Sequence, residues 1–270
     1  MRRSILPRRQ LFGLEFLDLE SVAEVASELV GFAPDTSHDE TLPVVVTPNV
    51  DQLVKLDRRV DPVASRIVSG ARYVLPDGQP IVWASRLLGT PLRGRLAGSS
   101  LVPEMWAGLL EEGRTVLVVA SSEEIARRVE ADGPGTHAAV APHLSLADRA
   151  SLETFVEQCT TTVRELRPSH VFVTLGFPKQ CNVIDGVLSR LQGAREPLPL
   201  FLAVGASFEM HYGLVRRAPA WMQRWGLEWF FRFLQEPRRL FRRYFIDDPA
   251  FAALVWREWR ARHRAGSRPS

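Results

Sequence analysis

Short apolar runs that alternate with helical patterns constrain the fold of this chain more than any other feature. Five runs have the composition of strands, at residues 42–47, 71–75, 114–120, 170–177 and 198–208. Helical patterns follow them, for example at residues 50–56, 81–88 and 122–131. Strands that are apolar along their whole length are buried on both faces, as in the parallel sheets of α/β proteins. The sequence therefore predicts an α/β fold, a mostly parallel sheet with helices on both faces.

The C-terminal segment, residues 216–270, differs from the rest of the chain in charge and aromatic content. It has thirteen arginines, no lysine and five acidic residues, so its net charge is +8, against +3 for the whole chain. Aromatic residues recur every four positions from Trp221 to Phe233, and Pro237 interrupts the pattern before a second helical stripe. We therefore predict an α/β domain at residues 1–215 and a basic, amphipathic helical appendage with its tail at residues 216–270.

Three kinds of partner suit such a basic, aromatic segment. In a nucleic-acid surface, arginine neutralises phosphates and aromatic rings stack on bases. At a membrane, tryptophan and phenylalanine lie at the level of the headgroups and arginine meets lipid phosphates. A helical stripe can also dock into the groove of a partner protein. The regular helical spacing argues against stacking on single strands, so we expect an anionic membrane surface or a partner protein, and no nucleic acid.

The remaining composition indicates a cytoplasmic protein. No apolar run approaches the roughly 20 residues that cross a bilayer, and the N-terminus does not resemble a signal peptide. Cys159 and Cys181 are the two cysteines, too few for a secreted disulfide scaffold. Metal-ligand spacing, a dinucleotide-binding fingerprint and a P-loop are all absent from the sequence, so no metal and no cofactor is predicted.

Polar side chains follow several of the predicted strands, and in open parallel sheets the ligand site lies outside the carboxyl ends of the strands. Asp77 lies in the turn Pro76-Asp77-Gly78, directly after the strand predicted at residues 71–75. One interpretation is a common turn residue whose carboxylate caps the next helix. The other is a general base at the edge of the sheet.

Two further strand ends carry polar groups. Thr47 and Asn49 follow the first strand, where Asn49 either caps the next helix or joins Thr47 in binding a hydroxyl or phosphate of a ligand. Gly176, Lys179 and Gln180 belong to the sequence GFPKQ after the fourth strand. This loop is either solvated or contacts a phosphate or sugar, because binding residues favour loops that a rigid scaffold holds.

Six segments together resemble the WecG/TagA/CpsF glycosyltransferases, in order and over residues 10–246. They are TPNVDQLVKL, LPDGQPIVWASRLLG, RLAGSSLVPEM, LGFPKQ, VGASFEMHYG and RRAPAWMQRWGLEWFFRFLQEPRRLFRRYF. The resemblance implies a Rossmann-like catalytic domain and an appendage that docks on the inner face of the cytoplasmic membrane. It also implies an inverting, metal-independent transfer of a hexose from a UDP-sugar to a saccharide on a polyprenyl diphosphate. A homo-oligomer is a further possible assembly.

The resemblance also assigns roles to individual residues. Asp77 matches the proposed catalytic base, Thr47 and Asn49 the active-site Thr-x-Asn, and Arg95 an arginine that meets the donor diphosphate. Gln180 matches the glutamine of the Pro-Lys-Gln-Glu motif. The arginines expected to reach the lipid-linked diphosphate and the membrane are Arg217, Arg238, Arg239, Arg242 and Arg243.

Some positions depart from the pattern of the family. Cys181 replaces the glutamate after Pro-Lys-Gln, Asn182 the following aromatic residue, and Ala206 the second glycine of a late Gly-Gly pair. These changes put the identity of the transferred sugar in doubt. They also motivate an alternative hypothesis, a catalytically degenerate member that binds lipid-linked saccharides as a scaffold.

Overall fold

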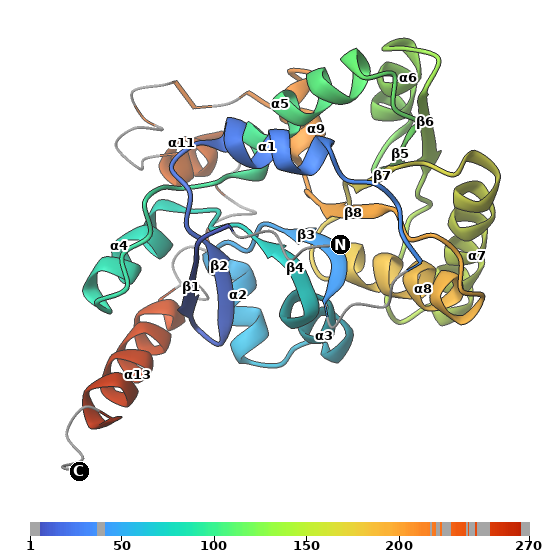
Figure 1. Cartoon of the computed structure of the whole chain (residues 1–270). Helices are drawn as coiled ribbons and strands as arrows, with labels where there is room; N and C mark the ends of the chain where they lie inside the picture. Colours follow the sequence, from blue (N-terminus) through green and yellow to red (C-terminus); the bar gives the residue numbers. More distant parts are fainter. Residues whose placement is uncertain are drawn as a thin grey trace.

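The structure is a computed structural model of the chain (Figure 1). It describes residues 6–36, 41–216, 228–235 and 249–265, together with residues 218, 219, 222, 237 and 241. In this part of the chain, eight strands form one sheet in the order β1-β2-β4-β3-β8-β7-β5-β6. They are β1 (Arg8–Leu11), β2 (Leu14–Leu17), β3 (Leu42–Val46), β4 (Ala71–Val74), β5 (Val116–Ala120), β6 (Thr136–Val140), β7 (His170–Val173) and β8 (Leu200–Ala203). All neighbours pair in parallel except β1 and β2, which form an antiparallel hairpin.

Helices cover both faces of the sheet, as the sequence predicts (Figure 1). One face packs against α2 (Val50–Asp57), α3 (Pro62–Gly70), α4 (Gln79–Leu87), α7 (Arg149–Leu166), α8 (Lys179–Gly193) and α13 (Ala250–Ala265). The other packs against α1 (Val22–Val30), α5 (Gly98–Glu111), α6 (Glu123–Ala131) and α9 (Ser207–His211). A further helix, α11 (Glu228–Gln235), lies in the predicted appendage.

The period-two geometry of a strand explains why the central strands are apolar throughout. On β5, Leu117 and Val119 belong to the core of one face, whereas Val116 and Val118 belong to the core of the other. Each side chain is therefore buried on whichever side it points. The mostly parallel α/β sheet and its five apolar strands are confirmed, although several predicted strands end earlier, such as β7 at Val173.

The two edge strands, β1 and β6, and β2 next to β1 gave no such signal. The hairpin β1-β2 reads RRQL and LEFL, because it has a solvent side on which polar residues are stable. The strand β6 reads THAAV, and four of its five side chains are only half-buried. An edge strand needs no continuous apolar run, so a search for such runs misses it.

The packing of α7 on α8 depends on a glycine, and we predict that filling this position destabilises the protein. A Cβ on Gly186 would lie 2.7 Å from Cγ1 of Val156 on α7, whereas a Cβ on Gly193 of the same helix meets nothing within 4 Å. Gly186→Ala should lower the free energy of unfolding by about 1–2 kcal/mol, since overpacking outweighs the better helix propensity of alanine. Gly193→Ala should raise it by about 0.5 kcal/mol. Urea unfolding measures both, and a destabilisation shared equally by the two variants would contradict this packing.

His170 connects β7 to α1 and makes stability depend on pH. Its Nε2 donates to the carbonyl of Leu29 at 2.8 Å, so Nδ1 is free of a proton and accepts from the Ser169 hydroxyl, also at 2.8 Å. Burial lowers the pKa of His170 from 6.5 to about 4. The unfolded chain therefore binds a proton between these pH values that the folded chain does not, and stability falls as the pH drops through this window.

We expect this histidine to cost the wild type about 1.4 kcal/mol of stability per pH unit between pH 6 and pH 4.5. The measurement is the free energy of unfolding against pH for the wild type and for His170→Gln, which cannot titrate. The curve of the variant should be flatter across this window, because the carboxylates contribute equally to both proteins. Parallel curves would mean that His170 is protonated in the folded protein.

The last helix, α13, packs against the α/β domain. Phe251 is buried, and its ring centroid lies 5.5 Å from that of Phe12 in the β1-β2 hairpin. Arg257 forms an ion pair with Asp57 at the end of α2. The tail of the predicted appendage therefore returns to the body of the protein. The division of the chain at residue 216 stays a prediction.

Candidate active site

Backbone hydrogen bonds tie the Asp77 turn to the end of the neighbouring strand. The N–H of Leu75 donates to the Val46 carbonyl at 2.9 Å, which continues the pairing of β4 with β3. The N–H of Asp77 itself donates to the Pro48 carbonyl at 3.2 Å. Asp77 therefore lies beside the Thr47-Pro48-Asn49 loop. The structure brings together the two strand ends whose polar residues the sequence singles out.

A third segment joins this cluster at the start of α5. The N–H of Leu96 donates to the Pro76 carbonyl at 2.9 Å, so the loop that carries Arg95 lies against the Asp77 turn. Gly98, the first residue of α5, approaches two other segments closely. A Cβ on Gly98 would lie 3.3 Å from Oγ1 of Thr47 and 3.0 Å from Oγ of Ser207. The ends of β3, β4 and β8 and the start of α5 therefore converge at one place.

Several helices begin at this edge of the sheet without a side-chain cap. The N-caps of α4, α5 and α8 are Gly78, Ala97 and Pro178, and none of the three makes a side-chain capping hydrogen bond. The first N–H groups of a helix have no partner within the helix, and its dipole favours negative charge there. An edge with several uncapped helix starts is suited to bind a phosphate group.

The structure decides between some of the interpretations of the polar strand ends and leaves others as predictions. The N-cap of α4 is Gly78, so Asp77 lies one residue before the cap and is half-buried. The capping role of Asn49 is confirmed, because its Oδ1 accepts from the N–H of Gln52 at 3.2 Å. Thr47 is buried next to Gly98. The binding roles of Thr47 and Asn49 stay predictions.

Gln180 has the environment of a ligand contact. The residue is only 3% exposed, and within the described part of the chain its Oε1 is buried without a hydrogen-bond partner. Leaving a buried carbonyl oxygen unpaired costs roughly 1–3 kcal/mol, so such atoms are rare unless a ligand or water completes them. Gly176 before it is exposed and has no atom near the position of a Cβ. Lys179 is half-buried.

The sequence did not single out the polar network at the ends of β5 and β7. The hydroxyl of Ser121 donates to Oε1 of Glu209 at 2.8 Å. The N–H of Ser121 donates to Oγ1 of Thr174, also at 2.8 Å, and that hydroxyl donates in turn to the Val119 carbonyl. Ser121 stands at a predicted strand end. Glu209 lies 88 residues later, in α9, so its contact with Ser121 is visible only in the folded structure.

The departures at positions 181 and 182 have structural roles. Cys181 is fully buried among the apolar residues of α8, and burial raises the pKa of its thiol to about 12. It therefore remains a neutral thiol and is no nucleophile. The Nδ2 of Asn182 donates to the Pro178 carbonyl and to Oδ2 of Asp61, both at 3.2 Å. Cys181 thus contributes to the apolar core, and Asn182 to hydrogen bonds at the start of α8.

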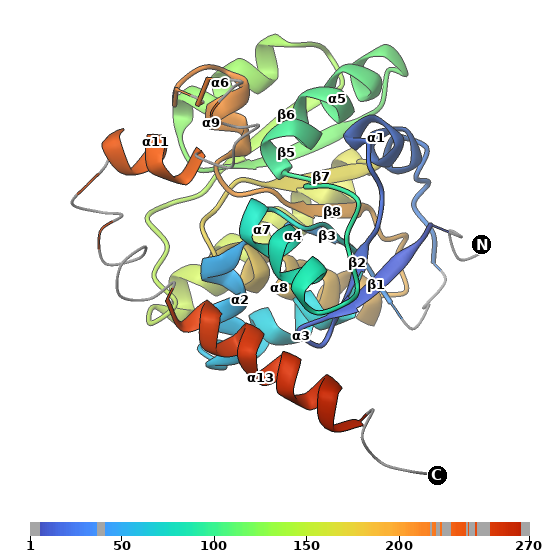
Figure 2. The ribbon, with the colours of Figure 1, turned by 90° about the vertical axis from the view of Figure 1, so that its left-hand side faces the viewer.

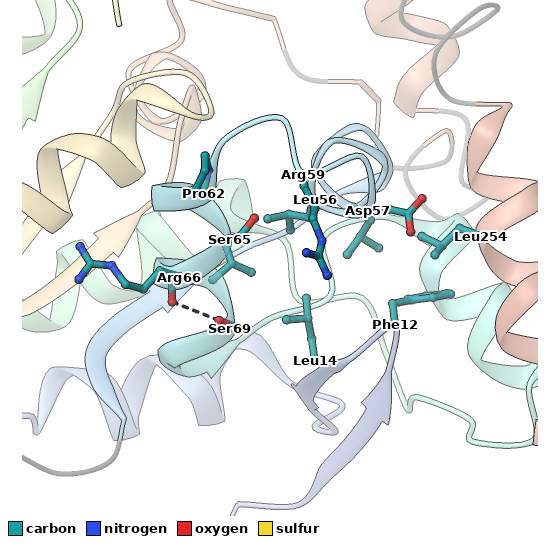
Figure 3. Close-up of a pocket in the computed structure, with 12 residues that line it drawn as sticks. Phe12, Leu14, Leu56, Asp57, Arg59, Pro62, Ser65, Arg66, Ser69 and Leu254 are labelled. Atoms are coloured by element: carbon teal, nitrogen blue, oxygen red, sulfur yellow. Dashed lines mark hydrogen bonds between the residues drawn. The ribbon is translucent and has the colours of Figure 1, made fainter. Parts of the chain in front are cut away.

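A pocket of about 490 Å³ lies elsewhere, between the β1-β2 hairpin and helices α2, α3 and α13 (Figure 3). Its lining is mostly apolar, with Phe12, Leu14 and Leu254 on three of these elements. None of the predicted site residues lines it. This pocket is therefore distinct from the convergence of strand ends.

Other predicted features lie partly or wholly outside the described residues. This applies to all five appendage arginines, Arg217, Arg238, Arg239, Arg242 and Arg243. Among the residues that are described, three or more histidine, cysteine, aspartate or glutamate side chains nowhere gather as a metal site. The described helices also include none with the length and apolarity to span a bilayer.

An α/β protein with polar side chains and uncapped helix starts at the carboxyl edge of its sheet has the architecture of many enzymes that act on phosphorylated ligands. The family model described as "Glycosyl transferase WecG/TagA/CpsF family" matches residues 9–265. The chain therefore belongs to the WecG/TagA/CpsF family and is a glycosyltransferase.

Curated relatives share moderate identity with the chain. Three of them are named N-acetylglucosaminyldiphosphoundecaprenol N-acetyl-beta-D-mannosaminyltransferase. The protein from Bacillus spizizenii is 29% identical over 248 residues, which cover 88% of this chain and 89% of the relative. The one from Bacillus subtilis is 27% identical over 195 residues, 71% of each chain. The one from Staphylococcus aureus is 23% identical over 239 residues, 88% and 89% of the two chains.

Proposed function

We propose that the protein transfers a hexose from a UDP-sugar to a saccharide carried on a polyprenyl diphosphate, with inversion at the anomeric carbon and without a catalytic metal. The observation that carries the proposal is the backbone-tied cluster of Thr47, Asp77 and the Arg95 loop at the carboxyl edge of the sheet. The names of the relatives, which describe sugar transfer to a lipid-linked diphosphate saccharide, support the acceptor class.

The proposed chemistry uses groups that converge at this edge. Asp77 accepts the proton of the acceptor hydroxyl as its oxygen attacks the anomeric carbon of the donor. The bond from that carbon to the diphosphate breaks on the opposite face, so the configuration inverts and UDP leaves. Arg95 and the N–H groups at the uncapped start of α5 meet the charge that develops on the diphosphate. Thr47, Asn49 and the Gly176–Lys179–Gln180 loop would position the sugars.

The acceptor class also bears on where the enzyme works. A polyprenyl diphosphate is anchored in a bilayer, so we propose that residues 216–270 dock on the inner face of the cytoplasmic membrane. Their arginines would bind lipid phosphates and the diphosphate of the acceptor.

A donor screen tests the proposal. The protein is incubated with UDP-glucose, UDP-N-acetylmannosamine or its uronic acid, together with a polyprenyl diphosphate-linked N-acetylglucosamine, and product is followed by mass spectrometry in the presence of EDTA. We expect turnover with one donor, unaffected by the chelator, and the opposite anomeric configuration in the product. Binding of the acceptor without turnover of any UDP-sugar would instead support the scaffold hypothesis.

A further inference from the structure

Helix α4, which begins directly after the Asp77 turn, exposes two large apolar side chains. Trp83 is 52% exposed and Leu87 is 65% exposed. They are four residues apart, so they lie on the same side of the helix. The other side of α4 is anchored in the protein through Ile81 and Val82, which are fully buried. The exposed pair is thus a fixed part of the α/β domain, outside residues 216–270.

The C-terminal helix α13 is fastened beside the end of α4. The guanidinium of Arg262 donates from Nη1 to the Leu88 carbonyl at 3.2 Å and to the Thr90 hydroxyl at 3.1 Å. From Nη2 it donates to the Gln10 carbonyl at 2.7 Å, and an ion pair with Glu258 fixes its orientation. Figure 2 shows α4 and α13 on the side of the molecule that faces the viewer. The surfaces of the two helices therefore belong to one region.

On α13 two exposed tryptophans lie beside polar side chains. Trp256 is 55% exposed, and the guanidinium carbon of Arg260 lies 4.4 Å from the centroid of its ring. Trp259 is 38% exposed, and its ring lies 4.1 Å from that of His263. Tryptophan beside arginine is the combination that helices use at the headgroup level of a bilayer.

The charge of α4 favours the same partner. Its exposed side carries Arg86 between Trp83 and Leu87, and the helix contains no acidic residue. An anionic surface complements this charge, whereas a second copy of the same basic region would repel it. The apolar side chains and the arginines together fit the interface of a bilayer that contains anionic lipids.

We propose that the docking surface extends beyond residues 216–270 onto the α/β domain, where Trp83 and Leu87 of α4 enter the interface of an anionic phospholipid bilayer beside Trp256 and Trp259 of α13. The inference rests on the proposed function in that the acceptor is carried in a bilayer. At about 1.5 Å per residue, α4 extends about 12 Å from Gln79, which follows the Asp77 turn, to Leu87. Docking through this helix holds Asp77 at a fixed height above the headgroups, where it meets the saccharide of the acceptor.

Vesicle binding tests this surface. The full chain is sedimented with vesicles of phosphatidylglycerol and phosphatidylcholine, as wild type, as Trp83→Gln/Leu87→Gln and as Trp256→Gln/Trp259→Gln. The matched control is Leu110→Gln, which removes an exposed leucine from the C-terminal half of α5. We expect each double variant to lose about tenfold in partitioning and the control to stay within about twofold. Turnover of a UDP-sugar with a soluble, short-chain acceptor should be the same in all four proteins.

A second measurement covers the case in which a double variant folds poorly. Lipids with brominated acyl chains quench tryptophan that enters the bilayer, and Trp83→Phe should remove part of the quenching seen in the wild type. Equal vesicle binding by the α4 variant and the control, or no change in quenching, would overturn the proposal. A dimer formed by the wild type but not by the α4 variant, with unchanged vesicle binding, would also overturn the proposal. In that case a second copy of the chain would cover the helix. Absence of turnover in every protein, with the loss of vesicle binding preserved, would count against the proposed function alone.

Discussion

Asp77→Asn is expected to lower kcat by about 10³-fold and to leave the KM values within a few-fold of the wild type. Asparagine has nearly the same shape as aspartate and suits the same turn, but its amide cannot take a proton from the acceptor hydroxyl. General-base catalysis typically contributes 10²–10⁴-fold to the rate, and an inverting transfer uses a single base. The backbone bond from the N–H of residue 77 to the Pro48 carbonyl is independent of the side chain, so the loop should keep its place.

The control for this prediction is a carboxylate from the same edge of the sheet. Asp51 lies in the first turn of α2, two residues after Asn49, and forms an ion pair with Lys55 at 2.9 Å. Asp51→Asn changes the charge near the site equally but removes no proposed base, so kcat should change by less than about twofold. Steady-state kinetics with saturating donor and acceptor measure both variants. Wild-type turnover by Asp77→Asn would remove Asp77 from the mechanism.

The sequence could predict the central part of this fold because burial on both faces leaves a strong signal. The runs at β3, β5 and β8 are apolar at every position, as is typical of strands between two layers of helices. The edge strands β1 and β6 and the neighbouring β2 carry polar or small residues, and the β1-β2 hairpin joins the sheet through β4, which comes much later in the chain. Local composition therefore predicts the layers of the fold better than the width of the sheet.

The candidate site could likewise be predicted from the sequence only in part. Strand ends with polar residues can be found from the sequence, and Asp77, Thr47 and Asn49 follow from that rule. Which ends meet depends on the strand order, in which β3 lies between β4 and β8 although β8 comes over 150 residues later. The approach of Gly98 to Ser207 and the buried Oε1 of Gln180 are consequences of this order. No pattern of spacing could reveal them.

Arg95→Ala is expected to lower kcat/KM by about 10²–10³-fold, through kcat more than through the KM for the donor. A donor diphosphate gains negative charge as the sugar departs, and without a metal that charge is met by arginine and N–H groups. Removing one donor that acts on a developing oxyanion typically costs 10²–10³-fold. Arg95→Lys should restore only part of the loss, because an ammonium group cannot form the two parallel hydrogen bonds of a guanidinium.

Arg93 is the matched control, since it lies in the same loop two residues earlier. Its guanidinium is half-exposed and its Nε lies 3.9 Å from the carboxylate of Asp18, so it has a structural partner of its own. Arg93→Ala should change kcat/KM by less than about threefold. The loop should stay in place in Arg95→Ala, because the bond from the N–H of Leu96 to the Pro76 carbonyl belongs to the backbone. Equal losses in the two variants would mean that the loop responds to its total charge, and Arg95 would then have no specific contact with the diphosphate.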